Sequence, residues 1–310
     1  KLLRLDWGMV LLVASISGVG FMMLYSVAGG SLEPWAGRQM ARFGAGMVLL
    51  AVVALTDIRL WKWSAPFAYL GALALLAVVE VAGEQRMGAQ RWLSLGPLTI
   101  QPSELMKIAL VMMLARYYAW LDPERTSRPL WLVPPLLLIL LPVALVLKQP
   151  DLGTAVLLAA GGTVVIFLAG VSWWYFATAG ALGTGAVWAV FASQGTSWQL
   201  LKDYQYRRIH TFLDPSSDPL GAGYHITQSK IAMGSGGLTG RGYIQGTQSR
   251  LNFLPEKHTD FIFTTLAEEF GAIGSFTLLG LYVLVAVAGF ASMARNRDRF
   301  GALLDRKSVV

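Results

Sequence analysis

The sequence predicts an all-α membrane protein that crosses the bilayer many times, and three observations support this fold class. Hydrophobic residues make up 55% of the 310 positions and charged residues only 14%, whereas a soluble domain averages about 25% charged residues. Apolar runs recur that match a span, which needs about 20 mostly apolar residues to cross roughly 30 Å of hydrocarbon. Lys and Arg gather in the short segments between these runs. We therefore expect one integral membrane domain over residues 1–310.

Eight apolar runs are predicted to be transmembrane helices. The first is too long for the core of a signal peptide and fits a retained span. Pro150 stops the fifth span, so that only a tight polar reversal, Lys148 to Asp151, separates it from the sixth. Residues 192–261 form a long loop before the last span. The predicted spans are 8–28, 39–56, 64–82, 103–120, 130–147, 152–169, 173–191 and 262–292.

The distribution of basic residues predicts which ends of the spans face the cytoplasm. Most Lys and Arg of the short loops fall on one side, which is therefore the cytoplasmic side: Lys1, Arg4, Arg59, Lys62, Arg116, Arg125, Arg128, Arg295, Arg297 and Arg299. This placement accounts for the net charge of +7 through topology and anionic membrane lipids, without nucleic acid as a partner. The 192–261 loop and the reversal at Lys148 then face outward.

A charged cluster lies directly before the last span and consists of Glu256, Lys257, His258 and Asp260. Ionisable groups at the edge of a bilayer are costly to keep there, so they indicate a functional site by default. Asp260, at the outer boundary, is the first candidate. Glu268 and Glu269 follow two to three helical turns later.

A second polar motif opens the fourth span at Gln101-Pro102-Ser103-Glu104. Proline and serine suit a helix start, and Glu104 in the first turn is favoured by the helix dipole. Capping alone leaves Lys107 unexplained, because it lies three residues further on the same helix face, where the two charges can neutralise each other. Arg91, just upstream, adds a second outward cation.

The reversal between the fifth and sixth spans has two possible interpretations. Asp151 is predicted to be the N-cap of the sixth span, which makes the segment a capped interfacial turn. In the functional reading, Lys148 and Asp151 line a polar, outward-facing cavity.

The long loop offers further cations at Arg207, Arg208 and Arg241. The glycine run around Arg241 lacks a dinucleotide fingerprint and a Walker lysine, so nucleotide binding is not expected. Its backbone amides could approach a phosphate, or the run could be a plain flexible loop. His225 and His258 with Asp260 suggest zinc, but their spacing does not provide a suitable set of ligands, and no structural metal site is predicted. The chain has no cysteine, which excludes disulfides and thiolate chemistry.

These motifs resemble the SEDS family (shape, elongation, division and sporulation proteins), and within it the RodA branch, over almost the whole chain. The resemblance includes the motifs around Arg91, Glu104 and Asp151. In the loop it covers Asp214-Pro215, Gly223-Tyr224-His225, Gln228-Ser229-Lys230, Gly240-Arg241-Gly242, Phe253-Leu254-Pro255-Glu256 and His258-Thr259-Asp260-Phe261. Leu201 to Gln205 and Gly246 to Ser249 are more similar to the elongation member than to the division member FtsW.

The resemblance implies a peptidoglycan glycosyltransferase of the bacterial cytoplasmic (inner) membrane that polymerises lipid II outside the membrane during cell elongation. A class B penicillin-binding protein, a transpeptidase, is the implied partner that crosslinks the product. The essential aspartate of the family maps onto Asp260. The family usually has ten spans, so this chain is expected to be truncated at its C-terminal end, where Phe300 to Leu304 resemble the start of another span.

The chemistry of glycosyl transfer agrees with the implied glycosyltransferase function. A sugar hydroxyl that attacks an anomeric carbon needs a general base, and a partly desolvated carboxylate such as that of Asp260 suits this role. The departing pyrophosphate needs cations or a divalent ion, magnesium or manganese. The candidate cations are Arg91, Lys107, Lys148, Arg207, Arg208 and Arg241, with Glu104 and Asp151 to orient them and His258 nearby. Two alternatives are a flippase for the lipid-linked precursor and a non-catalytic scaffold for the penicillin-binding protein.

Overall fold

The structure is a computed structural model that describes residues 6–86, 89–95, 98–200, 206, 210, 213–214, 222–247 and 257–295. It confirms an all-α membrane fold, with a helix at each of the eight predicted spans. These helices are α1 (Trp7–Val27), α2 (Ala36–Leu55), α3 (Ile58–Ala82), α4 (Pro102–Trp120), α5 (Pro129–Lys148), α6 (Leu152–Leu168), α7 (Trp173–Ser193) and α11 (Ile262–Arg295). The predicted start of a further span at Phe300 lies outside the described residues.

Aspartate caps explain where several of these helices begin. Asp6 accepts the backbone N–H of Met9 at the start of α1, and Asp57 accepts that of Arg59 at the start of α3. Such a cap satisfies an N–H group that has no partner within the helix. The cap at Asp57 places the start of α3 at Ile58, six residues before the predicted start at 64. The apolar run alone missed this first turn because it carries Arg59 and Lys62.

Six of the eight helices, α1, α2, α3, α5, α7 and α11, are long and apolar enough to cross a membrane. Helix α6 is apolar but has only 17 residues, and α4 carries Glu104, Lys107 and Arg116 along its 19 residues. The number of crossings therefore stays a prediction.

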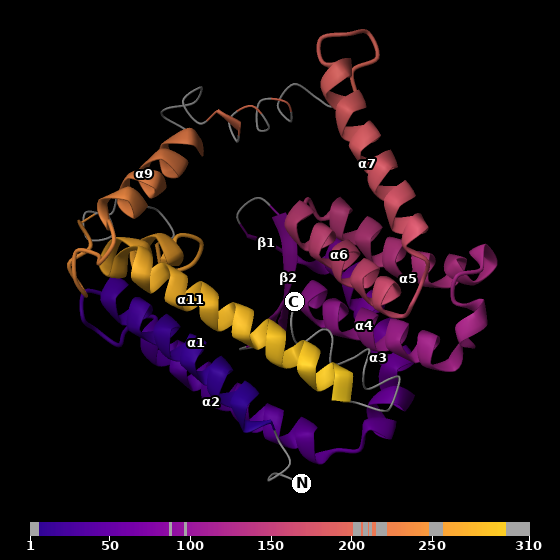
Figure 1. Ribbon diagram of the computed structural model, residues 1–310, viewed down its shortest axis with the longest axis horizontal. Coiled ribbons are helices and arrows are strands. Elements are labelled where there is room, and N and C mark those ends of the chain that lie inside the picture. The colour runs from indigo at the N-terminus through magenta and orange to yellow at the C-terminus, as the bar shows by residue number, and fades with distance from the viewer. Residues whose placement is uncertain are drawn as a thin grey trace. The chain divides into compact units, whose positions relative to one another are not determined.

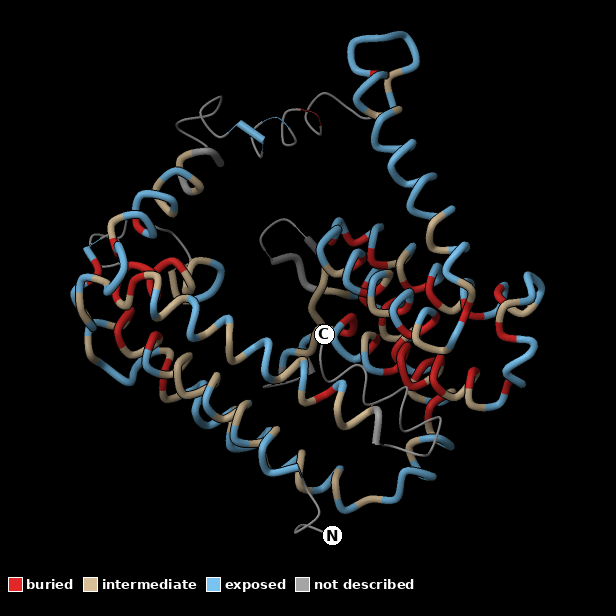
Figure 2. Tube along the Cα trace, viewed as in Figure 1, coloured by how far each residue is buried: buried red, intermediate tan, exposed pale blue. Residues whose placement is uncertain are grey.

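The chain forms two compact units, residues 1–55 with 181–285 and residues 56–180 with 286–310, and each is described by itself. The prediction of a single membrane domain stays a prediction. In the second unit α3, α4, α5 and α6 pack against one another, and a large cluster of buried apolar residues lies between them (Figures 1 and 2). Helix α4 contributes Met106, Leu110, Leu114 and Tyr118 to this core.

A small antiparallel sheet between α3 and α4 was not predicted. Its strands are β1 (Glu84–Arg86), β2 (Ala89–Leu95) and β3 (Leu98–Ile100), in the order β1-β2-β3. The strands are short, and the apolar-polar-apolar triplets Leu93-Ser94-Leu95 and Leu98-Thr99-Ile100 are the period-two signal for β2 and β3. This signal is weak beside long apolar helices. The sheet matters because β2 carries Arg91.

In the first unit, α11 is interrupted at Gly271, which has φ 66° and ψ −160°. The preceding segment, α9 (Ala222–Ser235) with residues 236–242, completes the hydrogen bonding at this break. The N–H groups of Ala272 and Ile273 donate to the carbonyls of Gly237 and Leu238 (2.9 and 3.1 Å). Irregular backbone at membrane depth is tolerated where protein buries it, and here the glycine-rich loop does so.

The predicted orientation can be tested with single cysteines, because the chain contains none. Thr227 on α9 and Glu124 in the 3-10 turn Pro123–Arg125 are both exposed, and the basic-residue rule places them outside and inside, respectively. We expect a membrane-impermeant thiol reagent to label Thr227→Cys in intact cells. Glu124→Cys should react only after the membrane is permeabilised. The reverse pattern would contradict both the orientation and an outward-facing reaction.

Candidate functional site

Arg91 and Asp151, predicted from separate motifs, come together where β2 meets the start of α6. The Arg91 guanidinium lies 3.6 Å (Nη1 to Oδ2) from the Asp151 carboxylate. It also donates to the backbone carbonyls of Gln149 (3.4 Å) and Pro150 (2.8 Å). Arg91 is thus anchored on the reversal between α5 and α6, and one third of its side chain stays exposed (33%).

Asp151 both caps α6 and holds Arg91. Its carboxylate accepts the backbone N–H (3.1 Å) and the hydroxyl (2.9 Å) of Thr154, which confirms the predicted N-cap. The same buried carboxylate faces Arg91. The side-chain amide of Gln149 donates to the Leu76 carbonyl (3.1 Å) and ties the reversal to α3. The reversal is therefore a rigid polar platform that holds a partly exposed cation.

Lys148 pairs with Glu80 and not with Asp151, and the expectation that Lys148 and Asp151 line one polar cavity stays a prediction. The Lys148 ammonium lies 3.4 Å from the Glu80 carboxylate near the end of α3, and 66% of the lysine side chain is exposed. The reason is geometric, because the Asp151 oxygens already serve Thr154 and Arg91. Sequence reasoning missed Glu80, although an acidic residue two positions before the end of a span was a visible signal.

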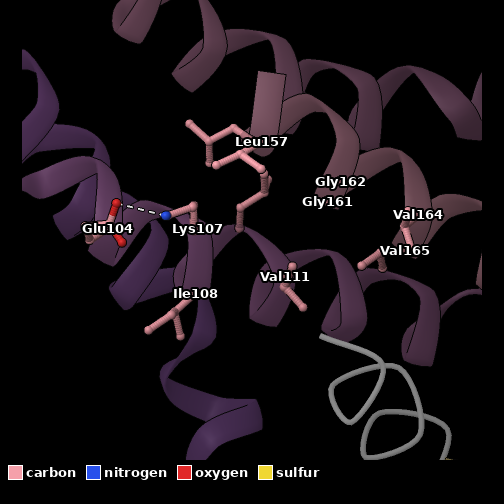
Figure 3. Close-up of a pocket in the computed structure, with 11 residues that line it drawn as sticks. Glu104, Lys107, Ile108, Val111, Leu157, Gly161, Gly162, Val164 and Val165 are labelled. Atoms are coloured by element: carbon pink, nitrogen blue, oxygen red, sulfur yellow. Dashed lines mark ion pairs between the residues drawn. The ribbon is translucent and has the colours of Figure 1, made fainter. Parts of the chain in front are cut away.

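Glu104 and Lys107 form the predicted ion pair on the first turns of α4, with 2.8 Å between Nζ and Oε1. Half of the Glu104 side chain is exposed (56%), whereas Lys107 is only a quarter exposed (25%). Both residues line a cavity of about 230 Å³ between α4 and α6. Figure 3 shows the pair at one end of this cavity, with Leu157 and Gly161 of α6 beside it. The other lining residues are Ile108, Leu110, Val111, Leu158, Gly162, Val164 and Val165.

Two adjacent glycines shape the α6 wall of this cavity in different ways. A Cβ on Gly162 would come within 2.6 Å of the Ile139 side chain, so glycine lets α5 and α6 approach closely there. A Cβ on Gly161 would have no heavy atom within 4 Å and would occupy open space. The cavity is thus apolar for most of its length, with one cation and one carboxylate at its end.

Asp260 belongs to the other unit and lies in the turn 257–261, two residues before α11 begins. Its side chain is exposed, and within the described residues it forms no ion pair. The imidazole of His258 stacks on the Trp35 ring, with 4.6 Å between centroids and 18° between planes. Burial lowers the pKa of Lys257, because it penalises the charged ammonium. The accessible Asp260 carboxylate thus follows, within three residues of sequence, the Lys257 ammonium and an imidazole that is positioned by Trp35.

Arg241 does not sit in a phosphate-binding backbone loop. The N–H groups of Arg241 and Gly242 donate to the carbonyls of Glu268 and Glu269, each at 3.0 Å, so these amides are already used. A Cβ on Gly240 would lie 2.1 Å from the Glu269 carbonyl oxygen, and Gly240 has φ +82°. The glycines therefore permit close packing of this segment against α11. This role differs from the two that the sequence suggested, a phosphate-binding loop and a flexible loop. The exposed Arg241 guanidinium donates to the Ser235 carbonyl (3.4 Å) and the Thr247 hydroxyl (3.0 Å).

Glu268 and Glu269 are buried in α11 just before its break, and the sequence assigned them no role. Glu268 Oε1 accepts the N–H (2.7 Å) and hydroxyl (2.9 Å) of Thr247, and Glu269 accepts the Ser26 hydroxyl of α1. Their exposed fractions are 0% and 2%. Two adjacent carboxylates in an apolar span were a signal in themselves, because such groups need partners inside the protein.

The remaining predicted residues, Arg207 and Arg208, lie outside the described residues. Among the residues that the structure does describe, no three His, Asp or Glu side chains converge in a group that could hold a metal ion.

The family model of the cell cycle proteins FtsW, RodA and SpoVE matches residues 6–309. The chain belongs to this family. The predicted membership of this family is therefore confirmed. The RodA-like branch is confirmed by the relative MrdB. The peptidoglycan glycosyltransferase MrdB of Escherichia coli is 42% identical over 307 residues, covering 97% of this chain and 79% of that protein. A probable peptidoglycan glycosyltransferase FtsW of Alkalilimnicola ehrlichii is 33% identical, covering 97% and 76%.

Solved structures agree with this family assignment. One comes from work on how a peptidoglycan synthase complex coordinates polymerisation and crosslinking. It is 34% identical, has a TM-score of 0.79, and covers 99% of this chain and 83% of its own. The crystal structure of the rod shape determining protein RodA of Thermus thermophilus is 30% identical with a TM-score of 0.67, covering 98% and 80%. This FtsW/RodA/SpoVE protein therefore shares its fold with a multi-pass membrane protein.

Proposed function

We propose that this chain is a peptidoglycan glycosyltransferase that polymerises lipid II at the outer face of the bacterial cytoplasmic membrane, with Asp260 as its catalytic base. The observation that carries the proposal is the 42% identity, over 97% of the chain, to a protein named peptidoglycan glycosyltransferase. The exposed carboxylate at the start of α11 supplies the group that such chemistry requires. A class B penicillin-binding protein is the partner, in keeping with the related synthase complex.

The reaction joins two sugars. The 4-hydroxyl of one sugar attacks the anomeric carbon of another, and the bond from that carbon to the lipid pyrophosphate breaks. Asp260 takes the proton of the attacking hydroxyl, and the electron pair of the broken bond leaves with the pyrophosphate. A base within hydrogen-bond reach of the hydroxyl contributes about 10²- to 10⁴-fold to such a step.

The pyrophosphate needs positive charge as it departs. Arg91 and Lys107 are suited to supply it, because each is held by a carboxylate and partly exposed. Asp151 orients Arg91, and Glu104 orients Lys107. Lys148, paired with Glu80, is a further cation near the same reversal. Arg207, Arg208 and Arg241 remain candidates from the long loop, and His258 lies two residues from the base. The Asp151 and Glu104 carboxylates are already engaged by Arg91 and Lys107, and the described residues hold no group of three acidic or histidine side chains, so they do not fit a magnesium or manganese ion.

The cavity between α4 and α6 is suited to a stretch of the polyprenyl chain of lipid II. Its walls are aliphatic or glycine, and its charged end at Lys107 would lie where the chain joins the pyrophosphate. This arrangement would place the leaving group beside a cation while the lipid tail stays between helices.

Filling this cavity should weaken substrate binding. Gly161→Leu places a side chain in open space and favours the helix. Displacing two buried CH₂ groups of the substrate, at about 0.8 kcal/mol each, should raise the KM for lipid II roughly tenfold. Gly71→Leu on α3 is the matched control, because Gly71 is exposed and its Cβ would also meet open space. An unchanged KM in Gly161→Leu would remove the lipid tail from this cavity.

The flippase alternative has one observation in its favour, which is the break in α11 beside two buried carboxylates. Transporters often bind substrate at broken helices near the bilayer midplane. Here backbone groups of residues 237–242 bond to both sides of the break, and the two carboxylates accept hydrogen bonds from Thr247 and Ser26. The backbone groups at the break are therefore already bonded within the protein. This favours a structural role for the break, in support of Asp260, over a substrate-binding site for transport. A purely non-catalytic scaffold would give no reason for Arg91 and Lys107 to keep part of their charged side chains exposed.

A further inference from the structure

A second cavity, with a volume of about 760 Å³, lies at the opposite ends of α3 and α4 from the Arg91 cluster. Its lining belongs to the first turns of α3 and the last turns of α4. Those helices have 25 and 19 residues, which at about 1.5 Å per residue separates the two ends by roughly the thickness of a bilayer core. The lining residues are Arg59, Lys62, Trp63, Met113, Arg116, Tyr117, Ala119 and Trp120.

Positive charge dominates this cavity. Three of its lining residues are cations, and in the described part of the chain none of the three pairs with a carboxylate. The nearby Asp57 carboxylate is used in capping α3 through the backbone N–H of Arg59 (2.9 Å). Arg116 is held in place, because Nη1 donates to the carbonyls of Lys62 (2.6 Å) and Trp63 (3.0 Å). The cavity thus has one positioned guanidinium and two adjustable cations.

Aromatic side chains mark this cavity as a site at the membrane surface. Trp63 and Trp120 are 63% and 68% exposed, and Trp and Tyr concentrate where hydrocarbon meets headgroups. The Tyr117 hydroxyl donates to the Trp131 carbonyl (2.7 Å), which fixes its ring at the cavity wall. Below the cations the face of α3 is apolar and exposed, at Phe67 and Leu70. A ligand here meets cations, then interfacial aromatic rings, then an apolar helix face.

We propose that this cavity binds the phosphate headgroup of an anionic phospholipid, whose acyl chains lie along the exposed face of α3. Basic pockets between membrane helices bind such headgroups, and each Lys or Arg near an anionic surface strengthens the attraction by about fivefold. The apolar face distinguishes a lipid from free phosphate, which would use the cations alone. The site is separate from the proposed reaction and does not depend on it.

To test this, the purified full chain is placed in nanodiscs of equimolar phosphatidylglycerol and phosphatidylcholine. The protein is then released, and native mass spectrometry identifies the lipid that it retains. We expect the wild-type protein to retain phosphatidylglycerol preferentially, and Arg116→Gln to lose about fivefold of that preference. The double variant Arg59→Gln/Lys62→Gln should lose more and leaves the contacts of the Arg116 guanidinium in place. Arg125→Gln is the matched control, because Arg125 is a nearby exposed cation that pairs with Asp122 and does not line the cavity.

Four outcomes decide the proposal. Preferential retention that falls in the cavity variants and persists in Arg125→Gln supports it. Equal retention of both lipids by the wild-type protein overturns it, and so does an equal loss in Arg125→Gln, which would reflect net charge alone. Displacement of phosphatidylglycerol by millimolar inorganic phosphate would assign the site to free phosphate instead of a lipid. None of these readouts involves glycan synthesis, so they are independent of the proposed enzyme activity.

Discussion

Asp260→Asn is expected to abolish polymerisation of lipid II while the protein still inserts into the membrane and folds. The amide has the size of the carboxylate but cannot accept a proton from the attacking hydroxyl at neutral pH. Loss of a general base costs about 10²- to 10⁴-fold in rate, which places the variant below detection in a gel assay of glycan chains. Asp260 is exposed, so the substitution should leave the thermal midpoint nearly unchanged.

Asp6→Asn is the matched control for this variant. Asp6 is likewise an exposed aspartate close to the start of a helix, where it caps α1, and asparagine caps a helix about as well. Glycan synthesis should persist in Asp6→Asn. Normal synthesis by Asp260→Asn would mean that the base is elsewhere in the chain.

Lys107→Met is expected to reduce turnover by about 10²-fold or more, because it removes a charge that stabilises the leaving pyrophosphate. Glu104→Gln should reduce turnover by a smaller factor, because the ammonium remains but loses its 2.8 Å partner. If Glu104 served only the helix dipole, Glu104→Gln would have little effect on activity, since the amide still suits a first turn. Stability should change little in either variant, because the carboxylate of this pair is half exposed (56%) and an ion pair open to solvent contributes about 0 to 1 kcal/mol.

Arg125→Met provides the control for the charge change in Lys107→Met. Arg125 and Asp122 form an ion pair with the same three-residue spacing, outside the α4–α6 cavity. Turnover and the thermal midpoint measured for all three variants separate a catalytic role from a structural one. Near-normal turnover in Lys107→Met would withdraw both α4 residues from the site.

The helices were predictable from sequence because each requirement on them is local. A span must be apolar over its own length, and its start can be marked by a nearby cap such as Asp151. The pairing of Glu104 with Lys107 was predictable for the same reason, since a spacing of three residues places both on one face of α4. These inferences needed no knowledge of how distant segments meet.

The parts that sequence reasoning missed depend on distant contacts. Glu80 and Lys148 meet only because α3 packs beside α5. The glycine run near Arg241 was predicted to be a phosphate loop or a flexible loop, but it completes the hydrogen bonds of a break 30 residues later at Gly271. Its composition could not reveal this, because glycine permits a close approach to backbone as readily as to a phosphate.

The central claim is that this chain itself joins lipid II into glycan strands. The most direct test is to reconstitute the purified full chain in liposomes with lipid II and the crosslinking partner, whose transpeptidase is blocked by a β-lactam. Products are then separated by size, and transfer of lipid II across the bilayer is measured in parallel. We predict a ladder of long glycan strands for the wild-type protein and none for Asp260→Asn. Transfer of lipid II across the bilayer without any polymer would contradict the claim and identify a transporter.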